Sequence, residues 1–432
     1  MSSRTLAARR DEAVGNGPRI CLFGAAPDVG NHGLNALMLA TLDGVTRRHP
    51  DAWITVFDNG LGRRRQRFEL DDRTVEVDCV GFRGGHRYYR PENHLTTRFA
   101  ARSGLLGNPG AAALATADVV LDISAGDSFT DLYGAKRFTV TVAGKRIALA
   151  TRRPLVLLPQ TYGPFLHRRS LDRATTLLRG SAAAWARGAD SYRRMVRMLG
   201  PDHDPSRHHL GVDMAFTLSP VPPEPAVVEQ LEGTLEVARG APVAGLNVSG
   251  LLYERANVED RYGLSVDYRR AVQQVAERIV ASGGTVLLVP HVGSDVAACR
   301  ALRDALDHPR VVLASPGLDA AETKWLIGRT DFFCGTRMHS TIAALTSRVP
   351  TCAVAYSLKT TEVFRTLGVA GRVADARRCT TDQLVEQVMQ GWDERAAIGA
   401  VLERSAPVAI AAARAQQDAI LDTVDHLIGV DA

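Results

Sequence analysis

Short apolar runs alternate with longer segments of helical pattern along most of this chain, and this alternation restricts the fold more than any other feature. We expect the apolar runs to be strands, at 19–24, 53–57, 74–80, 118–123, 155–158 and 182–186 in the first half, and at 243–248, 285–289, 310–313, 331–334 and 351–354 in the second. Strands that alternate with helices favour parallel sheets covered by helices. The predicted fold is therefore α/β, with two doubly wound parallel-sheet (Rossmann-like) domains and an interdomain cleft.

A polar, proline-rich stretch separates the two series of strands and helices. Residues 219–225 read Ser-Pro-Val-Pro-Pro-Glu-Pro, which can form neither a helix interior nor an inner strand. A chain of 432 residues is also too long for one ordinary domain. The expected organisation is a disordered tail at 1–17, an N-terminal domain at 18–212, a C-terminal domain at 213–395, and a helix at 396–432 for which packing on the first domain is one arrangement.

Composition indicates a globular protein and argues against nucleic-acid binding. Apolar residues make up 45% of the chain and charged residues 23%, which is typical of soluble domains. The net charge of +5 is mild, and no dense basic face interleaved with aromatic residues is evident. The one tight basic run, at 63–67, is interpreted as a solvated loop, with contact to an acidic substrate or a membrane surface as the alternative. The stretch at 81–110 is interpreted as a loop with a short helix over the cleft.

The six cysteines are scattered and form no CxxC pair, so we expect no structural zinc site. Cys21, Cys334 and Cys352 lie in or beside apolar runs and are expected to be buried, which fits a reducing cytoplasm. We expect no run to span a bilayer, and the first 17 residues lack the apolar core of a signal peptide. The expected location is the cytoplasm, with peripheral contact at the inner face of the membrane as an alternative. The oligomeric state is not predicted.

The most informative site candidate is the segment from Asp331 to Ser340, where an apolar run ends in Cys-Gly-Thr before Arg337 and His339. A helix pattern follows, so this Arg and His lie at a strand-to-helix junction, where open α/β sheets bind ligands. Helix N-termini favour anions, an Arg fork suits carboxylate or phosphate, and a His can move a proton. The pattern predicts a site for a small, multiply charged anion with acid–base chemistry beside it.

The glycine-rich loop after the first strand is a candidate for substrate binding. Its sequence from Gly24 to Gly33 is neither GxGxxG nor a phosphate loop with Lys-Ser/Thr, which argues against a nicotinamide cofactor. Asn31 and His32 are its polar candidates. A turn that merely needs its glycines is the alternative.

Two further strand ends of the first half carry polar candidates. Asp127 follows the strand at 118–123, where it could act as a general base toward a sugar hydroxyl or simply cap the next segment. Gln160 and Tyr162 end the strand at 155–158 and could hydrogen-bond a substrate, although a tight turn alone would also explain this proline- and glycine-punctuated sequence.

The second half offers two more candidates at strand ends. His291 follows the run at 285–289, and Lys359 follows the strand at 351–354 near the start of the next helix, where the macrodipole favours anions. A structural His and an ordinary exposed Lys are the alternatives. The histidines of the polar linker are expected in a solvated loop; they are His203, His208 and His209.

These motifs, in this order across residues 19–370, resemble the polysaccharide pyruvyl transferases. They are Asn31-His32-Gly33, Gly126-Asp127-Ser128-Phe129, Pro159-Gln160-Thr161-Tyr162-Gly163-Pro164-Phe165, Pro290-His291, Arg337-Met338-His339 and Tyr356-Ser357-Leu358-Lys359. The resemblance implies a GT-B-like fold. It also implies transfer of a pyruvyl group from phosphoenolpyruvate to a sugar of a cell-surface glycan, usually as a cyclic ketal, with release of phosphate.

The resemblance also implies residue roles. Arg337, His339, Lys359 and His291 would bind phosphoenolpyruvate, with His339 as acid and Asp127 as base, although which residue is acid and which is base stays open. The acceptor side would comprise Asn31, His32, Asp127, Gln160 and Tyr162. No metal or cofactor is expected beyond the donor substrate.

One departure from the family pattern bears on the acceptor side. Family members often have consecutive glycines before the Asp, whereas this chain has Ser124-Ala125. Two other functions remain as alternatives. One is a GT-B glycosyltransferase that uses a sugar nucleotide, and the other is a non-catalytic binding subunit.

Overall fold

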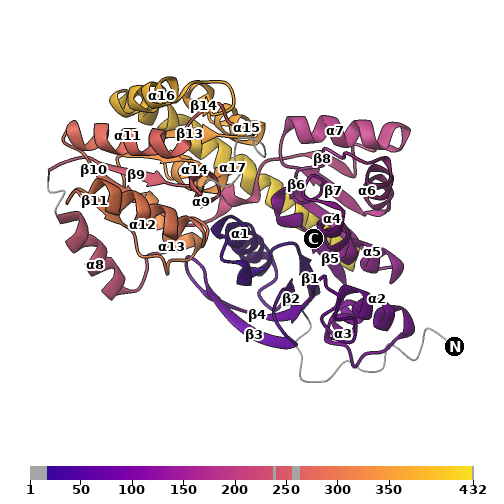
Figure 1. The fold of residues 1–432 in the computed structure, drawn as a ribbon. Coiled ribbons are helices and arrows are strands. Elements are labelled where there is room, and N and C mark those ends of the chain that lie inside the picture. Colours follow the sequence, from indigo (N-terminus) through magenta and orange to yellow (C-terminus); the bar gives the residue numbers. More distant parts are fainter. Residues whose placement is uncertain (1–16, 237–239, 255–262, 431–432) are drawn as a thin grey trace.

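The computed structural model describes residues 17–236, 240–254 and 263–430, and it contains two sheets packed against helices (Figure 1). This α/β architecture with two mainly parallel sheets is the predicted fold class, and it is confirmed. The expected disordered tail lies outside the described residues except for Gly17.

The first sheet has eight strands in the order β3-β4-β2-β1-β5-β6-β7-β8. The strands are β1 (Arg19–Phe23), β2 (Trp53–Asp58), β3 (Arg63–Glu69), β4 (Thr74–Gly81), β5 (Val119–Asp122), β6 (Leu155–Gln160), β7 (Ala183–Ala186) and β8 (His208–Leu210). The helices of this half are α1 (His32–Arg48), α2 (His94–Ser103), α3 (Pro109–Thr116), α4 (Ala135–Thr141), α5 (Ala143–Ala150), α6 (Arg168–Gly180) and α7 (Ala189–Leu199). All six residues of β6 are buried, as expected for a parallel strand covered on both faces.

The second sheet has six strands in the order β11-β10-β9-β12-β13-β14, and all of its pairings are parallel. The strands are β9 (Val243–Asn247), β10 (Thr285–Leu288), β11 (Val311–Leu313), β12 (Phe332–Gly335), β13 (Thr351–Ala355) and β14 (Val373–Asp375). The helices are α8 (Pro225–Glu236), α9 (Gly250–Tyr253), α11 (Tyr268–Ala281), α12 (Asp295–Leu306), α13 (Ala320–Ile327), α14 (Met338–Thr346), α15 (Leu358–Thr366), α16 (Thr381–Asp393) and α17 (Arg395–Ile428).

The basic run at 63–67 is not a solvated loop, as the sequence analysis expected, but most of the edge strand β3. It pairs antiparallel with β4, and its side chains alternate between exposed and half-buried. Arg63 reaches Asp78 at 2.6 Å and Arg67 reaches Glu76 at 2.6 Å, so ion pairs to the neighbouring strand offset much of the like-charge repulsion. The alternation typical of a strand cannot be seen in the sequence, because the half-buried face is mostly polar too: it consists of Arg64, Gln66 and Phe68.

Two other expectations from the sequence are wrong. His208 is not solvated, because it lies in the short edge strand β8, where it is almost fully buried and its Nδ1 accepts from the backbone N–H of Asp204. The segment at 81–110 does not cover the interdomain cleft; its helices α2 and α3 pack against each other, and α2 also contacts α5.

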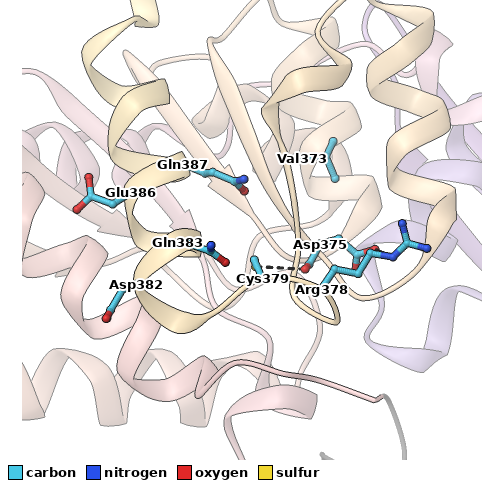
Figure 2. A pocket seen from close by; sticks show the side chains of 8 residues that line it. All are labelled: Val373, Asp375, Arg378, Cys379, Asp382, Gln383, Glu386 and Gln387. Carbon is cyan, nitrogen blue, oxygen red and sulfur yellow. Dashed lines mark hydrogen bonds and ion pairs between the residues drawn. The ribbon is translucent and has the colours of Figure 1, made fainter.

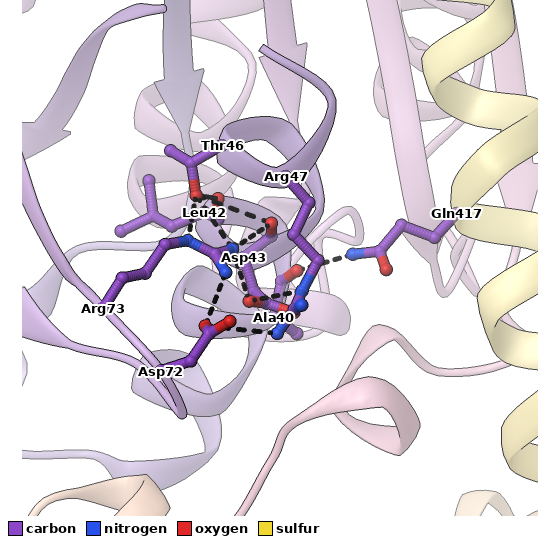
Figure 3. A network of polar contacts seen from close by, with 8 residues as sticks. All are labelled: Ala40, Leu42, Asp43, Thr46, Arg47, Asp72, Arg73 and Gln417. Carbon is purple, nitrogen blue, oxygen red and sulfur yellow. Dashed lines mark hydrogen bonds and ion pairs between the residues drawn. The ribbon is translucent and has the colours of Figure 1, made fainter. Parts of the chain in front are cut away.

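A network of arginines and aspartates fixes α1 to the turn that joins β3 and β4 (Figure 3). Arg73 Nη2 donates to Asp43 Oδ1 at 2.7 Å, and Arg47 Nε donates to the same carboxylate at 3.0 Å. Arg73 also reaches Asp72 at 2.7 Å. Because α1 also contacts α13, α14 and α17, this network holds the first sheet to the helix that lies between the two halves (Figure 1).

The last helix, α17, runs from the second half of the molecule to the first (Figure 1). Ser405 Oγ donates to the carbonyl of Leu367 in the second half, and Gln417 Nε2 donates to the carbonyl of Ala40 in α1 (Figure 3). Pro407 lies inside the helix. By length and composition α17 could cross a membrane (mean hydropathy 1.4), contrary to the expectation from the sequence, but in this fold it bridges the two halves.

Candidate active site

The carboxyl ends of strands from both sheets face each other, and two of the predicted loops meet there through their backbones. The N–H of His32 donates to the carbonyl of His291 at 3.1 Å, and the N–H of Gly293 donates to the carbonyl of Gly30 at 3.0 Å. An antiparallel bridge joins Asn31 to Val292. The glycine-rich loop of the first domain and the His291 loop of the second therefore form a direct interdomain contact.

A cleft of about 1510 Å³ lies between the two halves. Arginines and one lysine predominate among its charged lining residues, which are Arg137, Arg187, Asp190, Arg193, Arg194, Arg197, Asp213, Lys359, Glu362, Arg365 and Arg377. This predominance of cations gives the cleft a positive potential, which favours anionic ligands.

Arg337 is held by a carboxylate that the sequence analysis had not placed in the site. Arg337 is the residue before α14, and its Nη2 donates to Asp295 Oδ1 at 2.7 Å while its Nε donates to Oδ2 at 3.4 Å. Burial lowers the pKa of the Arg337 guanidinium, but the Asp295 contact outweighs it and raises this pKa above its ordinary value. The guanidinium is thus a permanent cation in a fixed orientation.

Asp295 is fully buried at the start of α12 and is tied to the loops around it. Its carboxylate accepts from the backbone N–H of Gly250 at 2.9 Å and of Val292 at 3.1 Å. Asn247 accepts the backbone N–H of Arg337 at 2.9 Å. Three strand ends of the second sheet therefore converge on this ion pair.

His339 faces Asp213, which lies just after strand β8 of the first sheet. Its Nε2 lies 3.6 Å from Asp213 Oδ2, which is an ion-pair distance but too long for a hydrogen bond. Asp213 also accepts from Arg187 Nη1 at 3.0 Å. Burial would raise the pKa of the Asp213 carboxyl, but His339 and Arg187 hold this pKa well below its usual range. The carboxylate of Asp213, which faces the His339 imidazole, is therefore ionised.

Gly33 is required for the approach of α1 to His339. A Cβ atom at position 33 would lie 2.4 Å from Nδ1 of His339, closer than any side chain could be accommodated. The glycine of the Asn31-His32-Gly33 motif therefore makes room for the histidine of the Arg337-Met338-His339 motif.

Asp127 forms a second ion pair, which joins the first half of the chain to Lys359 of the cleft lining. Lys359 Nζ donates to Asp127 Oδ2 at 2.7 Å, and Tyr133 OH donates to the same oxygen at 3.0 Å. Burial would raise the pKa of the Asp127 carboxyl, but Lys359 and Arg187 lower it below its ordinary value. Burial lowers the pKa of the Lys359 ammonium more than Asp127 raises it. The structure thus brings together two residues that the sequence placed on different domains.

The backbone that presents Asp127 adopts an unusual conformation. Ser124 and Ala125 have φ angles of 45° and 52°, a left-handed region that favours glycine. Ser124 is stabilised there because its N–H and Oγ both donate to Asp122 Oδ1, at 2.9 and 2.8 Å. The buried Lys145 completes this support by donating to Asp122 at 2.7 Å. The departure from consecutive glycines therefore keeps the glycine-like backbone.

The predicted acceptor residues Asn31 and His32 have structural roles in this conformation. The side chain of Asn31 caps α1 by accepting from the N–H of Gly33 at 2.9 Å. His32 Nδ1 lies 3.1 Å from Thr323 Oγ1 of the second domain. Binding of an acceptor by these two residues stays a prediction.

His291 is almost fully buried 5.2 Å from His32, measured between ring centroids, and neither of its ring nitrogens hydrogen-bonds to a described residue. Burial, together with His32, His339 and Arg337, lowers the pKa of His291 well below its ordinary value. His291 is therefore a neutral imidazole. It would contribute hydrogen bonds to a bound ligand, but no positive charge.

Gln160 and Tyr162 do not reach the cleft. Both side chains are fully buried in the first domain, where Gln160 Nε2 donates to the carbonyl of Asp122 at 3.0 Å and Tyr162 packs edge-on against Phe129. Their backbone positions at the end of β6 match the prediction, but their side chains support the neighbouring loop. A contact with the acceptor would require this region to rearrange.

Sequence reasoning missed two residues that the structure places in the cleft, Arg187 and Asp213. Arg187 follows β7 directly, and Asp213 lies three residues after β8. The strand-end rule that selected Asp127 and Lys359 would have found Arg187 as well. Asp213 gave no such signal, because β8 was interpreted as loop.

A second hollow, of about 650 Å³, lies on the second domain away from these residues (Figure 2). It is lined by Val373, Asp375, Arg378, Cys379, Asp382, Gln383, Glu386 and Gln387. It contains none of the predicted site residues, and Asp375 is already paired with Arg377 at 2.8 Å. The interdomain cleft is therefore the better candidate for the active site.

The part of the chain that the structure describes contains no cluster of metal-binding side chains. Among 17–236, 240–254 and 263–430, no group of three or more His, Cys, Asp or Glu side chains is arranged to hold a metal ion. The cysteines are free thiols, and Cys21, Cys334 and Cys352 are buried as expected. Burial raises the pKa of the Cys21 thiol to about 12, so this cysteine is inert.

Two kinds of comparison relate this chain to known proteins. A family model described as polysaccharide pyruvyl transferase matches residues 31–357, which is most of the chain.

Among solved structures, the UDP-GlcNAc 2-epimerase of Neisseria meningitidis bound to UDP-GlcNAc is 12% identical with a TM-score of 0.54, and the match covers 94% of this chain and 98% of that one. A glycosyltransferase of Rickettsia africae is 8% identical with a TM-score of 0.57, covering 96% and 100%. The Anabaena protein HepE in complex with UDP-glucose is 13% identical with a TM-score of 0.52, covering 94% and 99%. At these identities the likeness shows the shared GT-B-like fold alone.

Proposed function

Because the chain belongs to the polysaccharide pyruvyl transferase family, we propose that it transfers a pyruvyl group from phosphoenolpyruvate to hydroxyl groups of a sugar. The acceptor is a sugar of a cell-surface glycan, a glycolipid or a precursor of these, and the product is a pyruvate ketal with release of phosphate. The observation that carries this proposal is the ion pair of Asp127 with Lys359, which together with Arg187 lines a cleft whose charged residues are mainly cations.

The donor carries a carboxylate and a phosphate, so it needs at least two cations. Lys359 and Arg187 line the cleft, and Arg187 also lowers the pKa of the Asp127 carboxyl. Arg337 uses Nε and Nη2 for Asp295, and in the described residues no hydrogen bond involves its Nη1. That nitrogen is therefore the part of the guanidinium that would take a donor oxygen, and the Asp295 contact would fix its direction.

The acid in this scheme is His339. A proton on its imidazole passes to the methylene carbon of phosphoenolpyruvate, which makes C2 electrophilic. Tyr133 remains protonated, because burial and the neighbouring Asp127 raise the pKa of its phenol above its ordinary value. Tyr133 is thus a donor that can orient Asp127.

The base is Asp127, which takes the proton of a sugar hydroxyl as that oxygen attacks C2. Phosphate then leaves C2 with the proton that Asp127 took. A second hydroxyl adds at C2 to close the ketal, and its proton passes to His339, which restores the acid. Holding donor and acceptor together in the cleft supplies part of the rate enhancement, on the order of 7 kcal/mol in favourable cases. If phosphate is instead expelled by loss of a proton from the methyl group, the product is an enolpyruvyl ether.

No metal or cofactor other than the donor enters this scheme. The proposed location is the cytoplasm, where phosphoenolpyruvate is available, with the acceptor presented at the inner face of the membrane.

The test is phosphate release from phosphoenolpyruvate in the presence of candidate glycosides, followed by mass spectrometry of the product. We expect phosphate release that depends on the glycoside and is lost in Arg337→Ala and His339→Ala. A parallel assay offers uridine and guanosine sugar diphosphates as donors. Turnover with a sugar diphosphate and none with phosphoenolpyruvate would show that the protein is a glycosyltransferase instead.

A further inference from the structure

Residues 83–107 form an exposed surface of the first domain that the proposed reaction does not use. This surface, called here the α2 face, consists of α2 and the loops on either side of it. Six large apolar side chains of this segment are exposed: Tyr88, Tyr89, Leu95, Phe99, Leu105 and Leu106. Tyr89 is 80% exposed and Phe99 is 65% exposed. Single exposed apolar residues are common, but six within one short segment indicate an interaction surface.

The charges of the α2 face are of one sign. The segment contains five arginines, at positions 83, 87, 90, 98 and 102, and a single carboxylate, Glu92. Glu92 is buried, and its Oε1 accepts from the backbone N–H of Gly62 at 2.9 Å. Among the described residues, no ion pair joins Arg87, Arg90, Arg98 or Arg102 to a carboxylate. The exposed charge of this face is therefore entirely positive.

We propose that the α2 face docks the protein on the surface of a membrane that contains anionic lipid. Leu95 and Phe99 lie four residues apart on one side of α2, with Arg98 and Arg102 beside them, which is the pattern of a helix that lies in the membrane interface. Tyrosines are favoured at that depth, since the ring is apolar and the hydroxyl polar. Each arginine near an anionic surface adds an attraction that ionic strength weakens.

Charge complementarity favours lipid over a second copy of this chain. A twofold contact through the α2 face would place Arg98 and Arg102 against the same arginines of the other copy, and like charges opposed across an interface are unfavourable. An anionic lipid surface instead offers opposite charge over the whole face, and it receives the apolar side chains between the headgroups.

The edge strand β3 borders the α2 face but contributes little of its charge. Arg63 and Leu106 line the same hollow of about 510 Å³, so the basic run found in the sequence lies next to this surface. However, Arg63 and Arg67 are paired with Asp78 and Glu76. The unpaired arginines of the α2 face therefore supply most of the attraction.

The position of the α2 face relative to the cleft fits this role. Gly84, at one end of the face, packs against Val140 of α4, because a Cβ atom at Gly84 would lie 2.3 Å from Val140 Cγ2. Tyr133, which lines the cleft, precedes α4 by two residues. This helix has seven residues, a length of about 10 Å. One end of the α2 face therefore lies about one short helix away from a residue that lines the cleft.

Vesicle sedimentation tests this proposal independently of turnover. The full-length protein is mixed with phosphatidylcholine vesicles, with and without phosphatidylglycerol, at low and at high salt. We expect binding only to the anionic vesicles and only at low salt. Arg98→Gln/Arg102→Gln should lower the vesicle partition coefficient on the order of tenfold or more, and Phe99→Ser should lower it several-fold.

Matched variants control for net charge and for exposed apolar area. Arg300→Gln/Arg404→Gln removes the same charge from exposed arginines elsewhere, and Val408→Ser changes a side chain that is 69% exposed on α17. Both should bind vesicles like the unmodified protein. Equal binding by all variants, or absence of binding to anionic vesicles, would overturn the proposal. So would a change of molar mass in light scattering with Phe99→Ser but unchanged vesicle binding, because this would identify a protein interface.

Discussion

Two ion pairs in the cleft region have the same contact distance and opposite surroundings. Asp295–Arg337 and Asp127–Lys359 each join at 2.7 Å. Asp295 has no exposed side-chain area, and it also accepts backbone N–H groups from two loops. The side chains of Asp127 and Lys359 are 34% and 31% exposed, and the only other hydrogen bond described for the Asp127 carboxylate comes from the hydroxyl of Tyr133.

The difference in burial assigns different roles to the two pairs: the buried pair holds residues in position, and the exposed pair can take part in the reaction. Opening the Asp295–Arg337 pair would leave a carboxylate buried without its cation, which is strongly unfavourable, so this pair fixes geometry. The Asp127–Lys359 pair is partly solvated, and a donor anion can take Lys359 without burying an unpaired charge. Donor binding at Lys359 would then free Asp127 to accept a proton from the acceptor.

The largest expected effect is on stability at the buried pair. Asp295→Asn should lower the free energy of unfolding by about 3–5 kcal/mol, because Arg337 stays buried without its carboxylate. Urea denaturation followed by circular dichroism measures this change. Glu403→Gln, which breaks the exposed pair with Arg348, is the control and should cost less than about 1 kcal/mol. Equal losses of unfolding free energy in the two variants would show that the Asp295–Arg337 pair matters no more for stability than an exposed ion pair.

At the exposed pair the effect should fall on turnover. Asp127→Asn should lower kcat about 100-fold or more through loss of the base, while the free energy of unfolding changes by less than about 1 kcal/mol. The measurements are phosphate release with a competent acceptor and urea denaturation of the same preparation. A variant that kept its turnover, or that unfolded as readily as Asp295→Asn, would contradict the assignment.

Removal of the Lys359 ammonium should weaken the binding of phosphoenolpyruvate. Lys359→Gln should raise KM for phosphoenolpyruvate about tenfold, the effect of one charge-assisted hydrogen bond, with a smaller change in kcat. Lys136→Gln removes an exposed lysine of α4 and serves as the control. If the two lysine variants shared the KM of the unmodified protein, Lys359 would not be a donor ligand.

A buried lysine outside the cleft has a carbonyl, and no carboxylate, as its described hydrogen-bond partner. Lys324 of α13 is almost fully buried and donates to the carbonyl of Leu218, and burial, with Arg414 nearby, lowers the pKa of its ammonium from 10.5 to about 7. Between pH 7 and 10.5 the unfolded chain therefore holds a proton that the folded chain does not. Stability should rise with pH across this window, by up to about 1.4 kcal/mol per unit.

Lys324→Met should flatten this pH dependence. The measurement compares the difference in unfolding free energy between the variant and the unmodified protein at pH 7 and pH 9. A difference that does not change with pH would show that Lys324 keeps its ordinary pKa.

The sequence indicated the strands well where both faces are buried, and it missed three of the four edge strands, the exception being β11. The strands around β1 and β9 are continuous apolar runs, whereas β3 and β8 are polar edge strands whose pairing depends on a neighbour. β14, a further edge strand of three residues, was also missed.

The site followed the same logic. Asp127 and Lys359 were found because each follows a strand, but no local signal could show that residues 232 positions apart form an ion pair. The sequence placed Asp295 near His291, yet its partnership with Arg337 depends on how α12 and α14 pack. Likewise, the burial of Gln160 and Tyr162 is a property of the packed loop rather than of their position at a strand end.

The long C-terminal helix bears on how the lobes can move. Ser405 is attached to the second domain, while Gln416, which donates to the carbonyl of Val212, is attached at the boundary with the first. Pro407 lies between these anchors and cannot donate to the carbonyl one turn before it. Opening or closing of the cleft would therefore bend α17 mainly at Pro407. The helix would act as a hinge between the two domains to which it is attached.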